Sequence, residues 1–201
     1  MEIYLPLLAQ GLAIGLLTGI LYVLVALGLT LIYGILHIVN FAHGEIYMLG
    51  AMAVFYFHVV GGLPLAPTLL AIVVLSLLFG LAMRAIEEDE ETARMLGVNA
   101  NRVAALSVAL GFVLAAVAGA FVAPIYSLNP GMGLEPILMS FLIIIVGGLG
   151  SITGTVLAGL LVGVLQSVGG VLFGAEAAYG LVFAVMIAVL VVRPAGLLGR
   201  A

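Results

Sequence analysis

The sequence predicts an all-α integral membrane protein, a polytopic helical bundle with about six or seven spans and two Gly-interrupted helices. Hydrophobic residues make up 66% of the 201 residues, and the mean hydropathy is +1.45. Only nine acidic and five basic residues are charged, whereas about a quarter of a soluble domain is charged. Uncharged intervals of 42, 38, 32 and 40 residues allow several crossings, because one span needs roughly 20 apolar residues.

The same composition excludes whole classes of function. A water-soluble enzyme or a nucleic-acid-binding protein could not bury so much apolar surface, and disordered chains are poor in apolar residues. The chain has no Cys, which excludes disulfides and thiolate chemistry. All five basic residues are arginines, so a Walker A loop, which needs a Lys, is excluded too. We expect neither an enzyme nor a cofactor, and any ATP hydrolysis must occur on another chain.

The expected helices are apolar stretches whose boundaries are charged residues, glycines or prolines. In chain order they cover residues 5–33, 34–60 (interrupted), 65–83, 103–123, 136–146, 153–173 and 179–192. A charged loop at residues 84–102 and a surface loop at residues 124–135 lie between them. Small residues at four-residue spacing allow close helix packing in lipid. We expect such packing faces within the bundle at Gly11, Gly15 and Gly19, at Gly111, Ala115 and Gly119, and at Gly159 and Gly163.

The arginines predict the orientation of the chain in the membrane. Three of them lie in the charged loop, and the other two are Arg193 and Arg200. By the positive-inside rule, both regions face the cytoplasm. Three crossings before Arg84 then place the N-terminus outside.

The first break, residues 40–45, places ionisable side chains inside an apolar interval. Its sequence is Asn40-Phe41-Ala42-His43-Gly44-Glu45. A charge at mid-membrane costs roughly 2.5–3.5 kcal/mol on insertion scales, so such residues normally face a bundle interior or a watery path. Alternatively, Glu45 caps a half-helix or lies at the membrane surface. A metal site is not expected, because the spacing of His43 and Glu45 fits no helical ligand pair.

The second break, residues 147–151, has the sequence Gly147-Gly148-Leu149-Gly150-Ser151. So glycine-rich a stretch does not stay helical in lipid, and broken backbone is tolerated only where protein or water covers it. A phosphate cradle is rejected because no Lys follows. An intramembrane Ser nucleophile is a weak alternative, since the C-terminal half has no His to act as its base.

The two breaks occupy comparable places in the two halves of the chain. Paired interrupted helices of this kind point to the substrate site of a transporter. Helix starts near both breaks would direct backbone N–H groups toward a substrate carboxylate. We therefore expect the breaks to meet near mid-membrane and to line one polar path. The candidate path residues are Asn40, His43, Gly44, Glu45, Gly147, Gly148, Gly150 and Ser151.

The charged loop is expected to hold a short amphipathic helix that ends at Gly97, a suitable C-cap. Its acidic run, residues 87–91, is by itself best interpreted as solvated. Apolar residues on the exposed helix indicate docking to a partner protein. The candidate coupling residues are Glu91, Ala93, Arg94, Met95, Leu96 and Gly97.

Together these segments resemble the permease subunits of binding-protein-dependent ABC importers for branched-chain amino acids. The resemblance covers nearly the whole chain and rests mainly on the two breaks and on Arg193-Pro194-Ala195-Gly196-Leu197-Leu198-Gly199. It implies a single transmembrane permease domain over residues 1–201 in the cell inner membrane, with a coupling loop at residues 84–102. The implied partners are ABC ATPase subunits, a second permease subunit and an external substrate-binding protein.

The resemblance also shows one departure from the family. Its members look longer, with about two further helices and an external loop before Arg84. The implied function is inward movement of branched-chain amino acids, or of similar small polar solutes such as urea or amides. Two alternatives stay open: a passive small-solute channel with two re-entrant half-helices, and a shortened membrane partner that does not transport.

Overall fold

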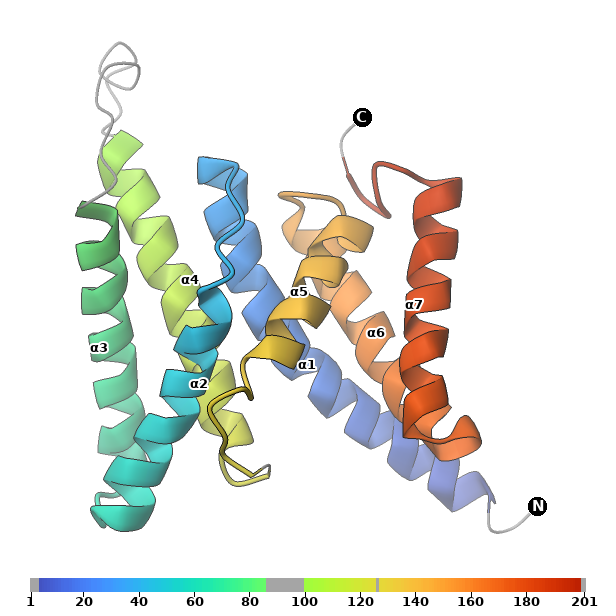
Figure 1. Cartoon of the computed structure of the whole chain (residues 1–201), viewed down its shortest axis with the longest axis horizontal. Helices are drawn as coiled ribbons and strands as arrows, with labels where there is room; N and C mark the ends of the chain where they lie inside the picture. Colours follow the sequence, from blue (N-terminus) through green and yellow to red (C-terminus); the bar gives the residue numbers. More distant parts are fainter. Residues whose placement is uncertain (1–3, 86–99, 126, 200–201) are drawn as a thin grey trace. The chain divides into compact units, whose positions relative to one another are not determined.

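The computed structural model describes residues 4–85, 100–125 and 127–199, and all regular structure within them is helical (Figure 1). Seven α-helices follow one another along this described part, and a π-helical stretch, η1, extends the second. Their bounds are α1 (Tyr4–Leu36), α2 (His43–Val54), η1 (Phe55–Val60), α3 (Leu65–Ala85), α4 (Ala100–Val122), α5 (Leu134–Gly147), α6 (Ile152–Phe173) and α7 (Ala175–Val192). The all-α fold expected from the sequence is confirmed.

Four of these helices are long and apolar enough to cross a membrane. They are Pro6–Leu36, Arg102–Val122, Ile152–Phe173 and Ala175–Val192, and Leu65–Leu81 and Leu134–Gly147 are shorter apolar helices. Four span-length helices and two shorter ones agree with the many crossings that the hydropathy predicts. The interruptions also fall where the sequence places them, after α1 and between α5 and α6.

Helices end where the chain carries glycines that adopt a backbone conformation rare for other residues. Gly62, with φ 68°, turns the chain between η1 and α3, and the His58 Nδ1 donates to the Leu63 carbonyl oxygen at 2.6 Å. Gly174, with φ 87°, separates α6 from α7. Because this one residue reverses the chain, α7 begins at Ala175. The sequence analysis expects that start four positions later, at Tyr179.

The chain divides into two compact units. The terminal unit comprises Met1–Leu27 and Leu138–Ala201, and the central unit comprises Gly28–Ile137. Both α1 and α5 therefore contribute residues to each unit. The first break lies in the central unit and the second break in the terminal unit.

In the terminal unit, α1 packs against α6 through backbone contact at glycines. A Cβ atom on Gly15 would lie 3.0 Å from the Gly163 carbonyl oxygen, and one on Gly19 would lie 3.2 Å from that of Gly159. Such close approach supplies the dispersion contacts that hold helices together in lipid. The glycine faces expected on both helices are confirmed as packing faces.

In the central unit, α4 packs against α1, α2 and α3 through small residues. A Cβ atom on Gly28 would lie 2.5 Å from the Gly111 carbonyl oxygen, and one on Gly80 would lie equally close to the Ala109 Cα. Further along α4, a Cβ on Gly119 would lie 2.8 Å from the Tyr47 carbonyl carbon of α2. The small-residue face expected on this helix is confirmed, and it holds the start of α2 in place.

Candidate functional site

The first break begins where α1 ends at Leu36. His37 adopts φ 55°, a left-handed conformation that is uncommon for a residue other than glycine. Its backbone N–H donates to the Tyr33 carbonyl oxygen at 2.8 Å, and the two aromatic rings lie 5.9 Å apart. The chain then runs without helical structure until α2 begins at His43.

A short polar turn starts α2. The Asn40 Oδ1 accepts a hydrogen bond from the Ala42 N–H at 3.0 Å, and the Asn40 carbonyl oxygen accepts one from the His43 N–H at 3.2 Å. An Asn side chain commonly bonds the backbone two residues on. Ala42, the N-cap residue, contributes no side-chain bond, and Glu45 lies in the first helical turn.

The structure also shows how deep the first break lies in the central unit. The His43 side chain is fully buried, and its ring centroid lies 5.9 Å from that of Phe112 on α4. Phe112 is at the middle of the span-length helix Arg102–Val122, so α2 begins level with the middle of a span. Gly28 makes room for the imidazole, because a Cβ there would lie 2.7 Å from the His43 Nε2. His43 thus fixes the start of α2 between α1 and α4.

The start of α2 contacts the start of α5. A Cβ atom on Gly44 would lie 2.6 Å from the Gly133 carbonyl oxygen and 3.0 Å from the Ile137 Cβ. Since α5 begins at Leu134, directly after Gly133, the N-terminal ends of two helices converge here. Both ends carry partial positive charge from their aligned peptide dipoles, and the N–H groups of Gly44 and Leu134 are bonded to carbonyl oxygens of the preceding turns.

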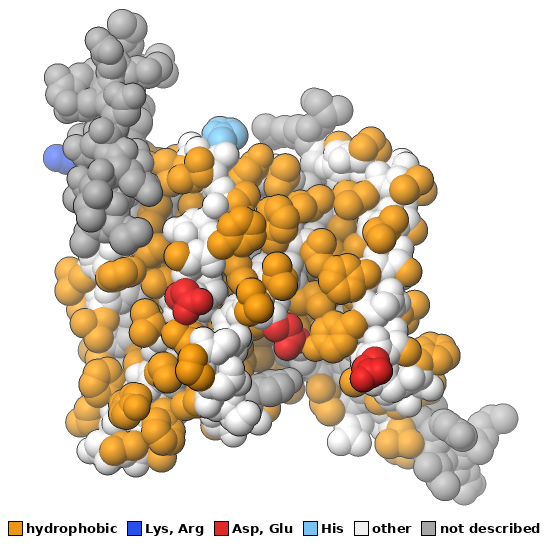
Figure 2. All heavy atoms as spheres, viewed as in Figure 1, with side chains coloured by type: hydrophobic (Ala, Val, Ile, Leu, Met, Phe, Trp, Pro, Cys, Tyr) orange, Lys and Arg blue, Asp and Glu red, His pale blue; other side chains and the backbone are white. Residues whose placement is uncertain are grey.

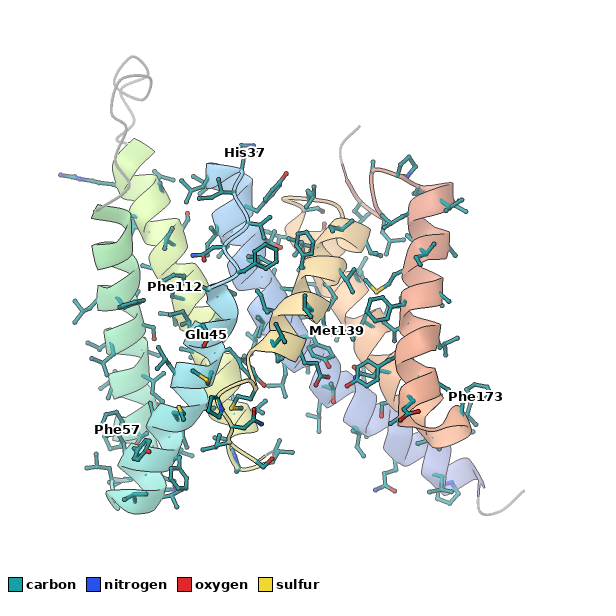
Figure 3. The ribbon with its side chains drawn as sticks, in the orientation of Figure 1. His37, Glu45, Phe57, Phe112, Met139 and Phe173 are labelled. Atoms are coloured by element: carbon teal, nitrogen blue, oxygen red, sulfur yellow. The ribbon has the colours of Figure 1, made fainter. Side chains whose placement is uncertain are left out.

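Each of the two converging helices carries one acid in its first turn. These acids are Glu45 on α2 and Glu135 on α5, and both side chains are exposed. Figure 2 shows acidic side chains on a face that is otherwise largely hydrophobic, and Figure 3 labels Glu45 near the start of α2. The converging starts of α2 and α5 thus each present an exposed carboxylate.

The sequence analysis missed the α5 side of this site. It treats residues 124–135 as a surface loop, although Asn129 there holds a turn by accepting the Gly131 N–H at 3.0 Å. A local signal was present, because Gly133 is followed by Glu135 and Pro136 in the first turn of a helix. Acids and proline are both typical of a helix start.

The second break joins α5 to α6 in the terminal unit. Gly148 and Gly150 adopt φ 105° and 79°, respectively, which favour glycine. Ser151 is the N-cap of α6, and its Oγ accepts a hydrogen bond from the Gly154 N–H at 3.2 Å. Its carbonyl oxygen accepts one from the Thr155 Oγ1 at 2.9 Å. The break is thus a tight, hydrogen-bonded helix–turn–helix connection.

The second break directly precedes a helix of span length. A Cβ on Gly147 would lie 2.5 Å from the Gly154 carbonyl carbon, so the two helix backbones touch at the turn. The 22-residue helix Ile152–Phe173 is by itself long enough to cross a membrane. The break therefore lies at the end of a span-length helix, and its expected position at mid-membrane stays a prediction.

The candidate residues fall into three groups. The central unit brings together Asn40, His43, Gly44 and Glu45, and the terminal unit brings together Gly147, Gly148, Gly150 and Ser151. The expected meeting of these two groups stays a prediction. The six coupling candidates, residues 91–97 apart from Thr92, lie outside the residues that the structure describes.

The fold and the two breaks define a multi-pass helical membrane protein with discontinuous helices, an architecture typical of transporters. The family model for the permease component of branched-chain amino acid transport systems matches residues 11–82 and 65–190. The chain belongs to this family. It is a family of transport permeases and not of enzymes.

Three relatives show how the chain compares with curated proteins. It is 29% identical over 293 residues to the high-affinity branched-chain amino acid transport system permease protein BraD of Pseudomonas aeruginosa, covering 95% of each chain. It is 38% identical over 122 residues to LivH of Escherichia coli, covering 60% of this chain and 40% of LivH. A probable LivH of Methanocaldococcus jannaschii is 31% identical over 130 residues, with 60% and 41% covered. No solved structure matches.

The relatives also differ from this chain in length. The BraD alignment spans 293 residues, against 201 in this chain, so BraD has segments that this chain lacks. The chain spans about 40% of the length of LivH. The two family matches share residues 65–82, within α3. This overlap coincides with the point before Arg84 where the sequence analysis locates the missing helices.

Proposed function

We propose that this chain is the membrane-spanning subunit of an ABC importer that moves branched-chain amino acids inward, powered by separate ATPase subunits. The observation that carries the proposal is the family match at residues 11–82 and 65–190. BraD and LivH are named as permeases for branched-chain amino acids, which supports this substrate class. Urea or short amides are the alternative small polar substrates.

The substrate path in this proposal passes the meeting point of α2 and α5. A branched-chain amino acid carries a carboxylate, an ammonium group and an apolar side chain. The converging helix starts at Gly44 and Gly133 offer the partial positive charge of two helix dipoles to the carboxylate. Glu45 and Glu135, both exposed, offer negative charge to the ammonium group. Asn40 and His43 hold this arrangement through the turn and the buried ring.

The second break has a supporting role in this proposal. Gly147, Gly148, Gly150 and Ser151 fix the connection between α5 and α6, and thereby the position of α5. Whether they also line the path is testable with single cysteines at Ala42 and Ile152, both exposed, in this Cys-free chain. A shared path makes both cysteines react with small water-soluble thiol reagents and cross-link at short range. If the two cysteines are too far apart to cross-link, the path is restricted to the first break.

Coupling to ATP is assigned to the loop at residues 84–102. In the inner membrane, this loop and the C-terminus face the cytoplasm by the positive-inside rule, where the loop docks on an ABC ATPase. A second permease subunit and an external binding protein complete the transporter. Replacing Gly97 with Trp should keep the ATPase bound and hydrolysing ATP but abolish ATP-driven uptake. Unchanged uptake in that variant would remove the coupling role of this segment.

The decisive experiment is reconstitution in proteoliposomes with an ABC ATPase that co-purifies with the chain and with a branched-chain amino acid binding protein. The proposal predicts leucine uptake that requires ATP hydrolysis and the binding protein. Uptake without ATP identifies a passive channel instead. A complex that assembles and hydrolyses ATP, yet moves no leucine, contradicts the proposal and identifies a partner that does not transport.

That last outcome is the second candidate function, and one observation favours it. The BraD alignment spans 293 residues against 201 here, so segments of a longer permease are absent. A shortened subunit can retain its assembly surfaces while lacking a complete path. Restoring the missing segment from BraD between Met83 and Arg84 would then recover uptake.

A further inference from the structure

The C-terminal segment, residues 193–199, completes the hydrogen bonding at the end of α5. An α-helix leaves its last four carbonyl groups without partners in the helix. In α5 these belong to Ile144, Ile145, Val146 and Gly147. The Gly148 N–H donates to the Ile144 and Ile145 oxygens, at 3.0 and 3.3 Å. The Leu197 N–H donates to the Val146 oxygen at 2.7 Å. The Leu198 N–H donates to the Gly147 oxygen at 3.1 Å.

These bonds matter because this end of α5 is buried. Val146 is 1% exposed, and Gly147 and Gly148 are also buried. A buried carbonyl group without a donor is costly, most of all in an apolar membrane protein. The usual solution is a cap built from the residues that follow the helix directly. Here the cap comes instead from the segment that follows α7.

Glycines make the close approach of the C-terminal segment possible. Gly196 has φ 83°, and a Cβ on it would lie 2.6 Å from the Gly148 N and 2.8 Å from the Ile145 oxygen. A Cβ on Gly148, whose φ is 105°, would lie 2.5 Å from the Gly199 Cα. Side chains at these positions would push the two backbones apart. The Gly196 N–H also donates to the Arg193 oxygen at 2.9 Å, which shapes the segment into a turn.

We propose that residues 193–199 act as a clasp that fixes the C-terminal end of α5 and so positions α5 for transport. α5 is one continuous helix from Leu134, next to Gly133, to Gly147. Gly133, directly before α5, contacts Gly44 at the start of α2. The helix that binds the clasp at its C-terminal end therefore adjoins the proposed path at its N-terminal end. The role of the clasp in transport rests on the proposed function, whereas the existence of the clasp does not.

The test measures the clasp directly in the full-length chain. Leu149 and Leu198 are 48% and 47% exposed, and both belong to the terminal unit, so nitroxide labels on cysteines there report the distance between the second break and the clasp. The labelled but otherwise wild-type protein should give one narrow distribution of short label–label distances. Gly196→Ala introduces the clashing Cβ, and Leu197→Pro removes the N–H that binds Val146. Both should broaden that distribution toward longer distances.

Two matched controls separate the clasp from general damage. Leu197→Ala keeps the backbone N–H, and Gly180→Ala adds a Cβ where nothing lies within 4 Å. Both should keep the narrow distance distribution. Amide hydrogen exchange in the wild-type protein needs no substitution: the N–H groups of Leu197 and Leu198 should exchange far more slowly than those of exposed loops. Fast exchange at both would overturn the clasp, even if Leu197→Pro fails to fold.

Reconstituted leucine uptake then tests the positioning role. Gly196→Ala should lower ATP-driven uptake about tenfold while ATPase binding is unchanged, because small misplacements remote from a functional centre cost this much or more. Unchanged label distances in Gly196→Ala overturn the clasp. Broadened distances with normal uptake overturn its role in transport. If the wild-type chain transports nothing, the proposed function and the positioning role both fail, and the label distances still decide whether the clasp exists.

Discussion

Both breaks contain glycine, but their surroundings are opposite. The first break lies level with the middle of α4, and the Asn40 side chain and short backbone bonds hold its turn. The second break lies at the end of the span-length α6, where Ser151 caps the helix and the clasp covers the backbone of α5. A glycine-containing interruption thus has no fixed role. Whether it forms an open site or a rigid connection depends on which groups hydrogen-bond its backbone N–H and C=O groups.

The breaks also differ in charge. Glu45 is exposed beside the converging starts of α2 and α5, whereas residues 147–151 include no ionisable side chain. The first break therefore combines a carboxylate with helix dipoles, which suits a zwitterionic substrate. The second break offers backbone groups and the Ser151 hydroxyl, and the structure already pairs most of them. We accordingly expect substitutions at the first break to affect transport and those at the second break to affect stability.

The largest effect is expected for Gly147→Ala. Its Cβ would lie 2.5 to 2.7 Å from the Gly154 carbonyl carbon and oxygen and from the Thr155 N, all backbone atoms that cannot rotate away. Overpacking of this kind typically costs about 1–3 kcal/mol, and we expect the upper end. Thermal unfolding in detergent measures it. Gly170→Ala, in a helix position with nothing within 4 Å, is the matched control and should be neutral or stabilising.

Glu45→Gln should separate transport from stability. The substitution keeps the shape and removes a charge that helps to bind the ammonium group, so ATP-driven uptake should fall about tenfold, the equivalent of 1.4 kcal/mol. The lost interaction with the helix dipole lowers stability by only about 0.3–1 kcal/mol.

Glu176→Gln is the control for this substitution. Glu176 also lies in the first turn of a helix, α7, so its loss should cost the same small amount of stability and leave uptake unchanged. Equal uptake in the Glu45 and Glu176 variants would show that the first break is not part of the path.

The smallest effect concerns the caps of the two restarting helices. Ser151→Ala removes the bond to the Gly154 N–H and should lower the free energy of unfolding by about 1 kcal/mol. Ala42→Ser should give almost no gain, because Ala42 has φ −63° and ψ −9° and not the extended conformation from which a cap side chain reaches the helix N–H groups. Chemical denaturation of the two variants checks this difference. A clear gain at Ala42 would mean that the first break relaxes readily.

Much of the fold follows from local sequence signals. Long uncharged intervals predict the helices, and the glycines at positions 61–62 and 147–150 predict where they stop, because an apolar helix ends where its backbone can no longer stay regular. The small-residue faces at Gly15, Gly19, Gly159 and Gly163 predict which sides of α1 and α6 pack. Each of these features depends on neighbours within one or two turns.

Local signals can mark a helix start, as Glu135 and Pro136 do for α5, but they do not indicate which other helix that start contacts. The burial of His43 depends on Gly28 and Phe112, which lie on two other helices. Gly133 is expected in a surface loop and instead contacts Gly44. The C-terminal segment is part of the family resemblance, but its amino-acid sequence does not indicate that its N–H groups bind the last carbonyl oxygens of α5.

The sequence by itself determined that this protein is a helical membrane protein with two interruptions, because hydropathy and helix periodicity act residue by residue along the chain. Only the tertiary structure decided what each interruption does. A helix end in a membrane must satisfy its free N–H and C=O groups, and the partners come from wherever the fold brings another backbone close. At Gly44 that backbone belongs to the preceding turn, where the Phe41 carbonyl oxygen accepts its N–H, whereas at Gly147 it is the C-terminal segment, which closes the helix end.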